Sequence, residues 1–140
     1  CKGIYNENTP ANNTQSSIVE VGSGSLNVQS ATTLNNIYNA DNLLINNSET
    51  KYYFTSSNGV HYLSTTSLFK TLVTDKKIPS ILEISRESFA NTDSTSIIVD
   101  FLYMNDKNNE NYIYKYNVYL NQFEDSFQLT SDVIDLEIYR

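Results

Sequence analysis

The feature that most constrains the fold is a two-residue alternation of side chains in the second half of the chain. In residues 96–104 and 112–120, large apolar or aromatic side chains recur at every second position. This period places successive side chains on opposite faces of a β-strand. In residues 133–139, Ile134, Leu136 and Ile138 alternate with acidic residues, as in a strand with one face in water. The pattern predicts a mainly β domain, built as a small antiparallel β-sandwich.

Two hairpins are predicted in the first half of the chain. Residues 18–28 alternate on both sides of a Gly-Ser-Gly break, which indicates two short strands joined by a turn. Residues 51–55 and 60–63 flank the sequence Ser-Ser-Asn-Gly, whose last two residues favour a tight hairpin turn.

Two other segments have apolar side chains at helical spacing. In residues 64–73, Leu68, Phe69, Leu72 and Val73 share one side of a predicted helix. Residues 32–44 have a weaker helical pattern that is interrupted by asparagines, and their last residues could instead begin a strand. The predicted sandwich therefore includes one or two short helices.

Charge limits the partners. The formal net charge is −7, and only nine of the 140 residues are Lys or Arg. Because nucleic-acid binding depends on cations that neutralise phosphates, we expect no nucleic-acid partner. Cys1 and His61 are the only soft metal ligands, so we expect neither a metal site nor a cofactor.

Cys1 is the only cysteine, so no disulfide can form within the chain and the apolar core must hold the fold. Cys1 and the polar stretch that follows it resemble the mature start of a bacterial lipoprotein, in which a signal peptide is removed and the cysteine is acylated. Lys2 resembles the residue found in lipoproteins sent to the outer membrane. The resemblance implies that residues 1–17 tether a single domain, residues 18–140, to a membrane through acyl chains on Cys1, on the periplasmic side or at the cell surface.

The polar segment between the two strongest predicted strands is the first candidate binding site. We predict a loop over residues 105–111, and loops on a rigid scaffold commonly bind partners. Its acceptor side chains partly match a calcium loop, but the required glycine and the final glutamate are missing, so we interpret it as a polar turn. The candidate partner-binding residues in this loop are Asn105, Asp106, Lys107, Asn108 and Glu110.

A row of tyrosines, Tyr112, Tyr114 and Tyr116, is the second candidate site. Tyrosine offers a large contact area at low entropic cost, so the row could stack on sugar rings or pack on a partner protein. The alternative is that the row forms a face of the sandwich core, because Val118 and Leu120 continue it.

The order of the predicted elements carries a further resemblance. The segments are Ser64–Val73 with Phe69, Ile81–Ser85, Ile97–Asp106 with Tyr103, Tyr114–Tyr116 and Val133–Tyr139. This order resembles the outer-membrane lipoprotein family of type VI secretion systems, a transthyretin-like sandwich. The family's turn of an aromatic residue followed by Arg and Asp is interrupted here by Met104 and Asn105. The resemblance implies a protein that anchors a trans-envelope complex and binds an inner-membrane partner through its loops.

These observations predict a non-enzymatic, lipid-anchored docking or assembly subunit of an envelope complex. His61 is the only histidine, and its neighbours in sequence do not suggest a catalytic triad, so we interpret it as structural. The alternative prediction is a surface or periplasmic binding module that uses the tyrosine row for a glycan or protein ligand.

Overall fold

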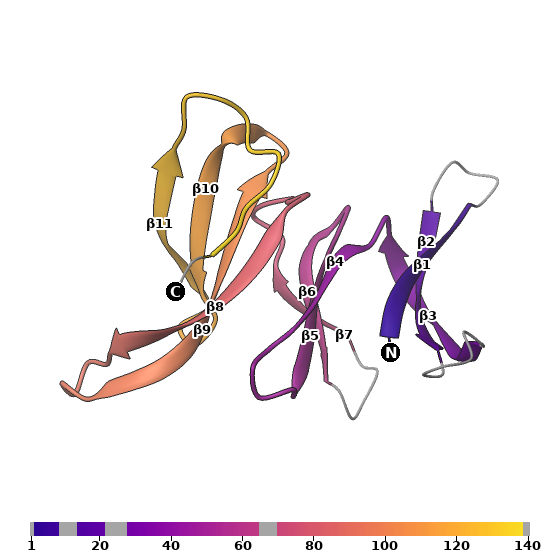
Figure 1. Cartoon of the computed structure of the whole chain (residues 1–140), viewed down its shortest axis with the longest axis horizontal. Helices are drawn as coiled ribbons and strands as arrows, with labels where there is room; N and C mark the ends of the chain where they lie inside the picture. The colour runs from indigo at the N-terminus through magenta and orange to yellow at the C-terminus, as the bar shows by residue number, and fades with distance from the viewer. Residues whose placement is uncertain (1, 9–13, 22–27, 65–69, 139–140) are drawn as a thin grey trace.

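The computed structural model describes residues 2–8, 14–21, 28–64 and 70–138. In these residues the secondary structure consists of eleven β-strands, without a helix, arranged in three antiparallel sheets (Figure 1). The N-terminal sheet contains β1 (Lys2–Asn8), β2 (Thr14–Val21) and β3 (Val28–Tyr38). The middle sheet contains β4 (Asp41–Ile45), β5 (Lys51–Ser56), β6 (Gly59–Ser64) and β7 (Lys70–Thr74). The C-terminal sheet contains β8 (Leu82–Ala90), β9 (Ser96–Asp106), β10 (Asn109–Asn117) and β11 (Gln122–Gln128).

Within each sheet, every strand pairs with the strand that follows it in sequence. The middle and C-terminal sheets therefore have the same four-stranded meander topology, one after the other along the chain. The three sheets follow one another along the long axis of the molecule, with the middle sheet between the other two (Figure 1). The mainly β, antiparallel prediction is confirmed. Side chains of the two four-stranded sheets pack in one core, which is consistent with a sandwich.

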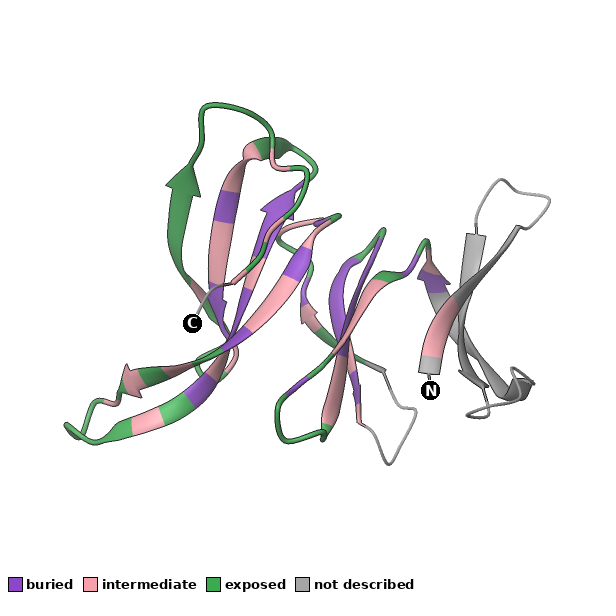
Figure 2. Cartoon of the chain, viewed as in Figure 1, coloured by how far each residue is buried: buried purple, intermediate pink, exposed green. Residues whose placement is uncertain are grey.

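The middle sheet is apolar on both faces, because alternate residues of its strands enter two different cores. Leu43 of β4 and Phe54 of β5 join the first core, whereas their neighbours Leu44 and Tyr53 join the second. Figure 2 shows this sheet with buried residues on its central strands, β5 and β6. A strand that is buried on both faces has no solvent-exposed face, so apolar and polar residues do not alternate along its sequence.

The first core joins the N-terminal sheet to the middle sheet. Phe54 and Leu63 from the middle sheet pack with Ile37 at the end of β3 and with Ile4 of β1. The second core joins the middle sheet to the C-terminal sheet. Its buried members are Tyr53, Val60, Leu82, Leu102, Met104 and Tyr116.

The hairpin predicted between residues 51–55 and 60–63 is confirmed, with β5 and β6 in register from Lys51 and Ser64 to Ser56 and Gly59. Gly59 has a φ of 125°, and a Cβ at this position would overlap the carbonyl oxygen of Thr74 on the neighbouring strand. Only glycine fits this turn without moving β7. The hairpin predicted over residues 18–28 is also formed, because β2 and β3 pair from Val21 and Val28 onward.

The predicted helix over residues 32–44 is wrong. Residues 32–38 belong to β3, and β4 follows after a sharp turn. Asn39 and Asn42 have φ values of 55°, a left-handed conformation that asparagine tolerates better than most residues. Of the asparagines that interrupt the helical pattern, Asn39 lies in the turn between β3 and β4, whereas the others belong to the two strands. In the second predicted helix, residues 65–69 lie outside the described residues, and Lys70–Thr74 form β7 instead.

Three other expectations also differ from the structure. Residues 133–138 belong to no strand, and residue 139 lies outside the described part. Residues 105–111 are a tight hairpin with only Lys107 and Asn108 between β9 and β10, so the predicted long loop is wrong. The N-terminal residues, predicted as a polar tether, contribute β1, which pairs with β2 across the expected boundary, with Ile4 opposite Ile18.

We predict that Leu102→Ala lowers the free energy of unfolding by about 2–5 kcal/mol, because it opens a cavity in the second core. Leu136→Ala should cost clearly less, because Leu136 is half-buried and belongs to neither core. Urea denaturation followed by circular dichroism measures both values. An equal cost for the two substitutions would contradict this assignment of the core.

Candidate functional site

Two of the predicted partner-binding residues, Asn105 and Asp106, are buried and bind the connection between the middle and C-terminal sheets. Asn105 Oδ1 accepts hydrogen bonds from the backbone amides of Ser80 and Ile81, both at 2.9 Å, and Asn105 Nδ2 donates to Ser80 Oγ at 3.0 Å. Asp106 Oδ1 accepts from the amide of Ile78 at 3.1 Å. These two side chains thus hold the segment that links β7 to β8.

The other three residues of the predicted loop, Lys107, Asn108 and Glu110, are exposed at the β9–β10 turn. The chain after β11 returns to this turn, because the amide of Leu129 donates to Asn111 O at 2.8 Å and that of Val133 donates to Glu110 O at 2.7 Å. This return places a second group of exposed side chains near the turn.

This second group is apolar. Ile134 is 93% exposed, and Phe127 and Leu129 are each a little less than half exposed. Phe127 lies on β11, which has β10 as its only strand partner in the described part of the chain. Figure 2 shows β11 and the chain that follows it as almost entirely exposed. We call the surface formed by Lys107, Asn108, Glu110, Phe127, Leu129 and Ile134 the C-terminal edge.

The sequence analysis did not identify β11 or the exposure of its apolar residues. Phe123 and Phe127 are four residues apart, so a regular strand would place them on one face. A register shift between β10 and β11 lies between them, and Phe123 packs on the second core whereas Phe127 is exposed. The expected final strand, which places Ile134 on its dry face, is not formed. One sequence signal could have indicated this surface. Between residues 127 and 134, the apolar residues Phe127, Leu129 and Ile134 stand in a largely polar segment.

The tyrosine row lies on the side of β10 that faces the middle sheet. Tyr116 is 3% exposed, and its hydroxyl donates to Val73 O at 3.2 Å. The rings of Tyr112 and Tyr114 are stacked, with centroids 5.9 Å apart, and Lys77 Nζ lies 4.3 Å from the centroid of Tyr114. Tyr116 is thus a core residue, whereas Tyr112 and Tyr114 are half-buried and remain candidates for contact with a ligand.

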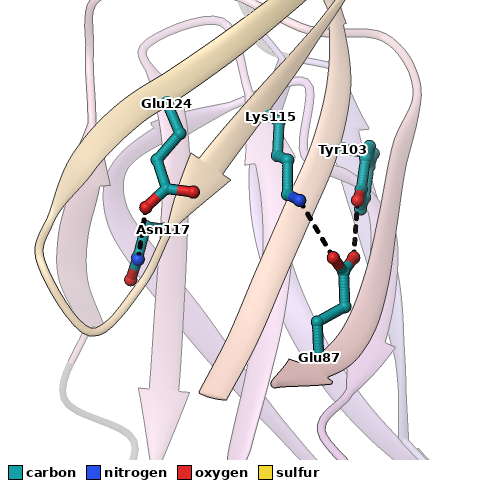
Figure 3. A network of polar contacts seen from close by, with 5 residues as sticks. All are labelled: Glu87, Tyr103, Lys115, Asn117 and Glu124. Atoms are coloured by element: carbon teal, nitrogen blue, oxygen red, sulfur yellow. Dashed lines mark hydrogen bonds and ion pairs between the residues drawn. The ribbon is translucent and has the colours of Figure 1, made fainter. Parts of the chain in front are cut away.

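The opposite face of the C-terminal sheet carries a polar network of Glu87, Tyr103 and Lys115 (Figure 3). Tyr103 Oη donates to Glu87 Oε2 at 2.5 Å, and Lys115 Nζ donates to Glu87 Oε1 at 2.9 Å. Burial alone would raise the pKa of Glu87, but these hydrogen bonds outweigh it and lower that pKa. Burial raises the pKa of Tyr103, and its bond to Glu87 raises it further.

In this network Lys115 keeps its proton, because its bonds to Glu87 and Tyr103 raise its pKa despite the opposing effect of burial. Lys115 also lies over the ring of Phe101, at 4.4 Å from the centroid. Each charge is matched by its neighbour, and each group is held in the protonation state that it has in water at neutral pH. The network therefore fits a role in fixing β8, β9 and β10 together better than a role in proton transfer.

The pKa of Glu83 on β8 is affected by acidic residues of the chain that follows β11. Partial burial raises its pKa, and the negative charges of Asp135 and Glu137 raise it further. The C-terminal residues thus lie close enough to β8 for like charges to repel. In Figure 1 this segment returns from the end of β11 across the sheet towards the label of β8.

His61, which the sequence analysis interprets as structural, is buried. Its Nε2 lies 2.8 Å from Ser56 Oγ, and its ring stacks on Phe54 with centroids 5.3 Å apart. Ser56 Oγ also accepts a hydrogen bond from the amide of Asn58, so the pair closes the β5–β6 turn. Both side chains are buried.

Cys1 lies outside the described residues. Within the described ranges, no helix is long and apolar enough to cross a membrane. The same ranges contain no group of three or more His, Cys, Asp or Glu side chains placed to hold a metal ion. No family model matches the chain, and no curated protein or solved structure is significantly similar to it.

We predict that Asn105→Ala lowers the free energy of unfolding by about 1–3 kcal/mol, because it removes the hydrogen bonds that the buried Asn105 side chain makes with the amides of Ser80 and Ile81. Asn108→Ala, at the exposed tip of the same hairpin, should change it by less than about 0.5 kcal/mol. Chemical denaturation compares the two. A neutral Asn105→Ala would show that this side chain does not hold the connection.

We also predict a pH-dependent effect of Glu83→Gln. The raised pKa means that ionised Glu83 disfavours the folded state at neutral pH, and that this cost disappears as pH falls through that pKa. Glu83→Gln should therefore raise the melting temperature at pH 7. The difference from the parent protein should vanish below the ordinary glutamate pKa of about 4.3. A lower melting temperature for Glu83→Gln at pH 7 would contradict the repulsion.

Proposed function

We propose that this protein is a non-enzymatic docking or assembly subunit, anchored by acylated Cys1 at the outer membrane of a bacterial envelope. In this proposal it joins a trans-envelope complex, of which a secretion apparatus is one kind. The contact that binds the partner protein is the C-terminal edge. The observation that supports this proposal most directly is the exposure of Phe127, Leu129 and Ile134 beside the polar turn of β9 and β10.

An edge strand with exposed apolar side chains is a surface on which proteins commonly associate. Its free backbone groups can pair with another strand, and apolar side chains next to it add area that is removed from water on binding. The exposed polar residues Lys107, Asn108 and Glu110 lie in the β9–β10 hairpin, to which the chain after β11 is hydrogen-bonded at Glu110 and Asn111. An apolar centre with a polar rim that contains both charge signs is the usual composition of a transient protein interface.

The rest of the fold supports this role by fixing the edge in place. The two cores hold the three sheets to one another, and Asn105 and Asp106 hold the connection next to the turn. A partner therefore meets a surface that is already ordered, which lowers the entropic cost of binding.

A second candidate function is a binding module that uses the tyrosines. It is favoured by one observation, the half-buried stack of Tyr112 and Tyr114 with Lys77 above the ring of Tyr114. A flat aromatic stack beside a cation can bind a glycan or a peptide, although Tyr116 no longer belongs to the available surface.

Photo-crosslinking in cells that carry the full-length precursor tests the docking proposal. A photoreactive side chain at Asn108 should give one defined crosslinked partner, because Asn108 is exposed at the proposed contact. Leu129→Glu combined with Ile134→Glu should reduce that product about tenfold or more, since charges replace apolar contacts. Leu72→Glu is the matched control, because Leu72 is similarly exposed but lies on β7 of the middle sheet, and it should leave the product unchanged.

The same cells test the anchor. Cys1→Ala in the precursor should move the protein from the membrane fraction to the soluble fraction and lower the yield of the crosslinked product. Retention of Cys1→Ala in membranes would contradict the lipid anchor. An undiminished product in the Leu129→Glu/Ile134→Glu protein, together with its loss on Tyr112→Ala or Tyr114→Ala, would favour the binding module instead.

A further inference from the structure

A cleft opens between the middle and C-terminal sheets at the end of β9 that lies away from the C-terminal edge. Its volume is about 430 Å³, within the range of ~300–1,000 Å³ typical of small-ligand sites. The lining residues used in the argument below are Lys51, Tyr53, Arg86, Ile98, Asp100 and Tyr119. Ile98 and Asp100 lie near the start of β9, whereas the C-terminal edge begins after its last residue.

The hydroxyl of Tyr53 is the unusual feature of this cleft. Tyr53 is 0% exposed, and among the described residues its Oη has no hydrogen-bond partner. A buried tyrosine normally gives its hydroxyl a partner, because leaving such a group unpaired destabilises the fold. Burial and the negative charge of Asp100 both raise the pKa of Tyr53, so the hydroxyl keeps its proton. It can therefore donate a hydrogen bond to a molecule in the cleft.

The charges of the cleft favour an anion. Arg86 and Asp100 are opposite each other in the pairing of β8 with β9, and Lys51 enters from β5. Two cations and one carboxylate line the site, in a chain whose net charge is −7. Lys51 is held over the ring of Tyr62, with its Nζ at 4.6 Å from the centroid. An arginine and a lysine that line the same cleft, one from each sheet, match a carboxylate, and a guanidinium can bind both of its oxygens.

Asp100 and Tyr53 indicate the rest of the ligand. A hydroxyl group can accept from Tyr53 Oη and donate to the Asp100 carboxylate at the same time, whereas a phosphate oxygen would be repelled by Asp100. An ammonium group would add a cation to a site in which cations already outnumber the carboxylate. Ile98 and Tyr119 are both more than half exposed at this cleft, and Tyr119 is supported by Phe89 with ring centroids 6.2 Å apart. They offer an apolar surface for the face of a sugar ring.

From this arrangement we propose that the cleft binds a uronic acid, either free or as one residue of an acidic polysaccharide. The carboxylate binds Arg86 and Lys51. A ring hydroxyl bridges Tyr53 Oη and Asp100, and the ring lies against Tyr119. This cleft and the C-terminal edge consist of different residues. A variant that abolishes binding at one of them therefore still allows binding at the other to be measured.

Isothermal titration calorimetry with glucuronate tests the site. Glucuronate should bind saturably at one site, and glucose and acetate should each bind about tenfold more weakly or worse, because each lacks one of the two recognised groups. Alanine tests the zwitterion alternative. The proposal is wrong if glucuronate shows no saturable binding, or if alanine binds more tightly than glucuronate.

Substitutions locate the binding. Arg86→Gln and Tyr53→Phe should each weaken glucuronate binding about tenfold. Lys107→Gln and Tyr103→Phe, which remove a cation and a tyrosine hydroxyl elsewhere, should leave it unchanged. Tyr53→Phe should not lower the melting temperature, because no described protein group depends on its hydroxyl. If Tyr53→Phe unfolds the protein, the test rests on Arg86→Gln, because Arg86 is exposed and its substitution should not affect folding. Glucuronate binding that survives Arg86→Gln undiminished would overturn the assignment.

Discussion

The rest of the structure depends on the burial of both faces of the middle sheet. β5 and β6 alternate between side chains that pack on the N-terminal sheet and side chains that pack on the C-terminal sheet. Tyr53 and Phe54 are adjacent in sequence, and both are fully buried, yet they belong to different cores. Apolar burial of this kind is the main favourable term in folding, so a chain without a disulfide can be held by these two contacts.

The same arrangement decides which surfaces are left for binding. The two faces of the middle sheet are used by the protein itself, and so is the face of β10 that carries Tyr116. Three places remain: the half-buried stack of Tyr112 and Tyr114, the far end where β11 and the returning C-terminal segment are exposed, and the cleft lined by residues of β5 and β9. The C-terminal edge and the proposed uronate cleft lie at the last two of these places.

The sequence predicts those strands in which the buried side chains recur at every second position. β9, β10 and the β5–β6 hairpin were found because large side chains recur at every second position or because Asn58-Gly59 requires a tight turn. The helix over 32–44 was wrong because spacing alone does not reveal that Asn39 adopts a left-handed turn. Burial of Asn105 and exposure of Ile134 could not be predicted, because both depend on contacts between distant segments, Asn105 with Ser80 and Val133 with Glu110.

Native-state hydrogen exchange tests the central claim most directly, because it measures the opening of each strand separately. If the middle sheet is the shared wall of two cores, the amides of β5 and β6 should exchange only through global unfolding, with the highest protection in the chain. The amides of β11, which borders a single strand, should exchange through smaller openings. Protection of β5 and β6 equal to or lower than that of β11 would contradict the account.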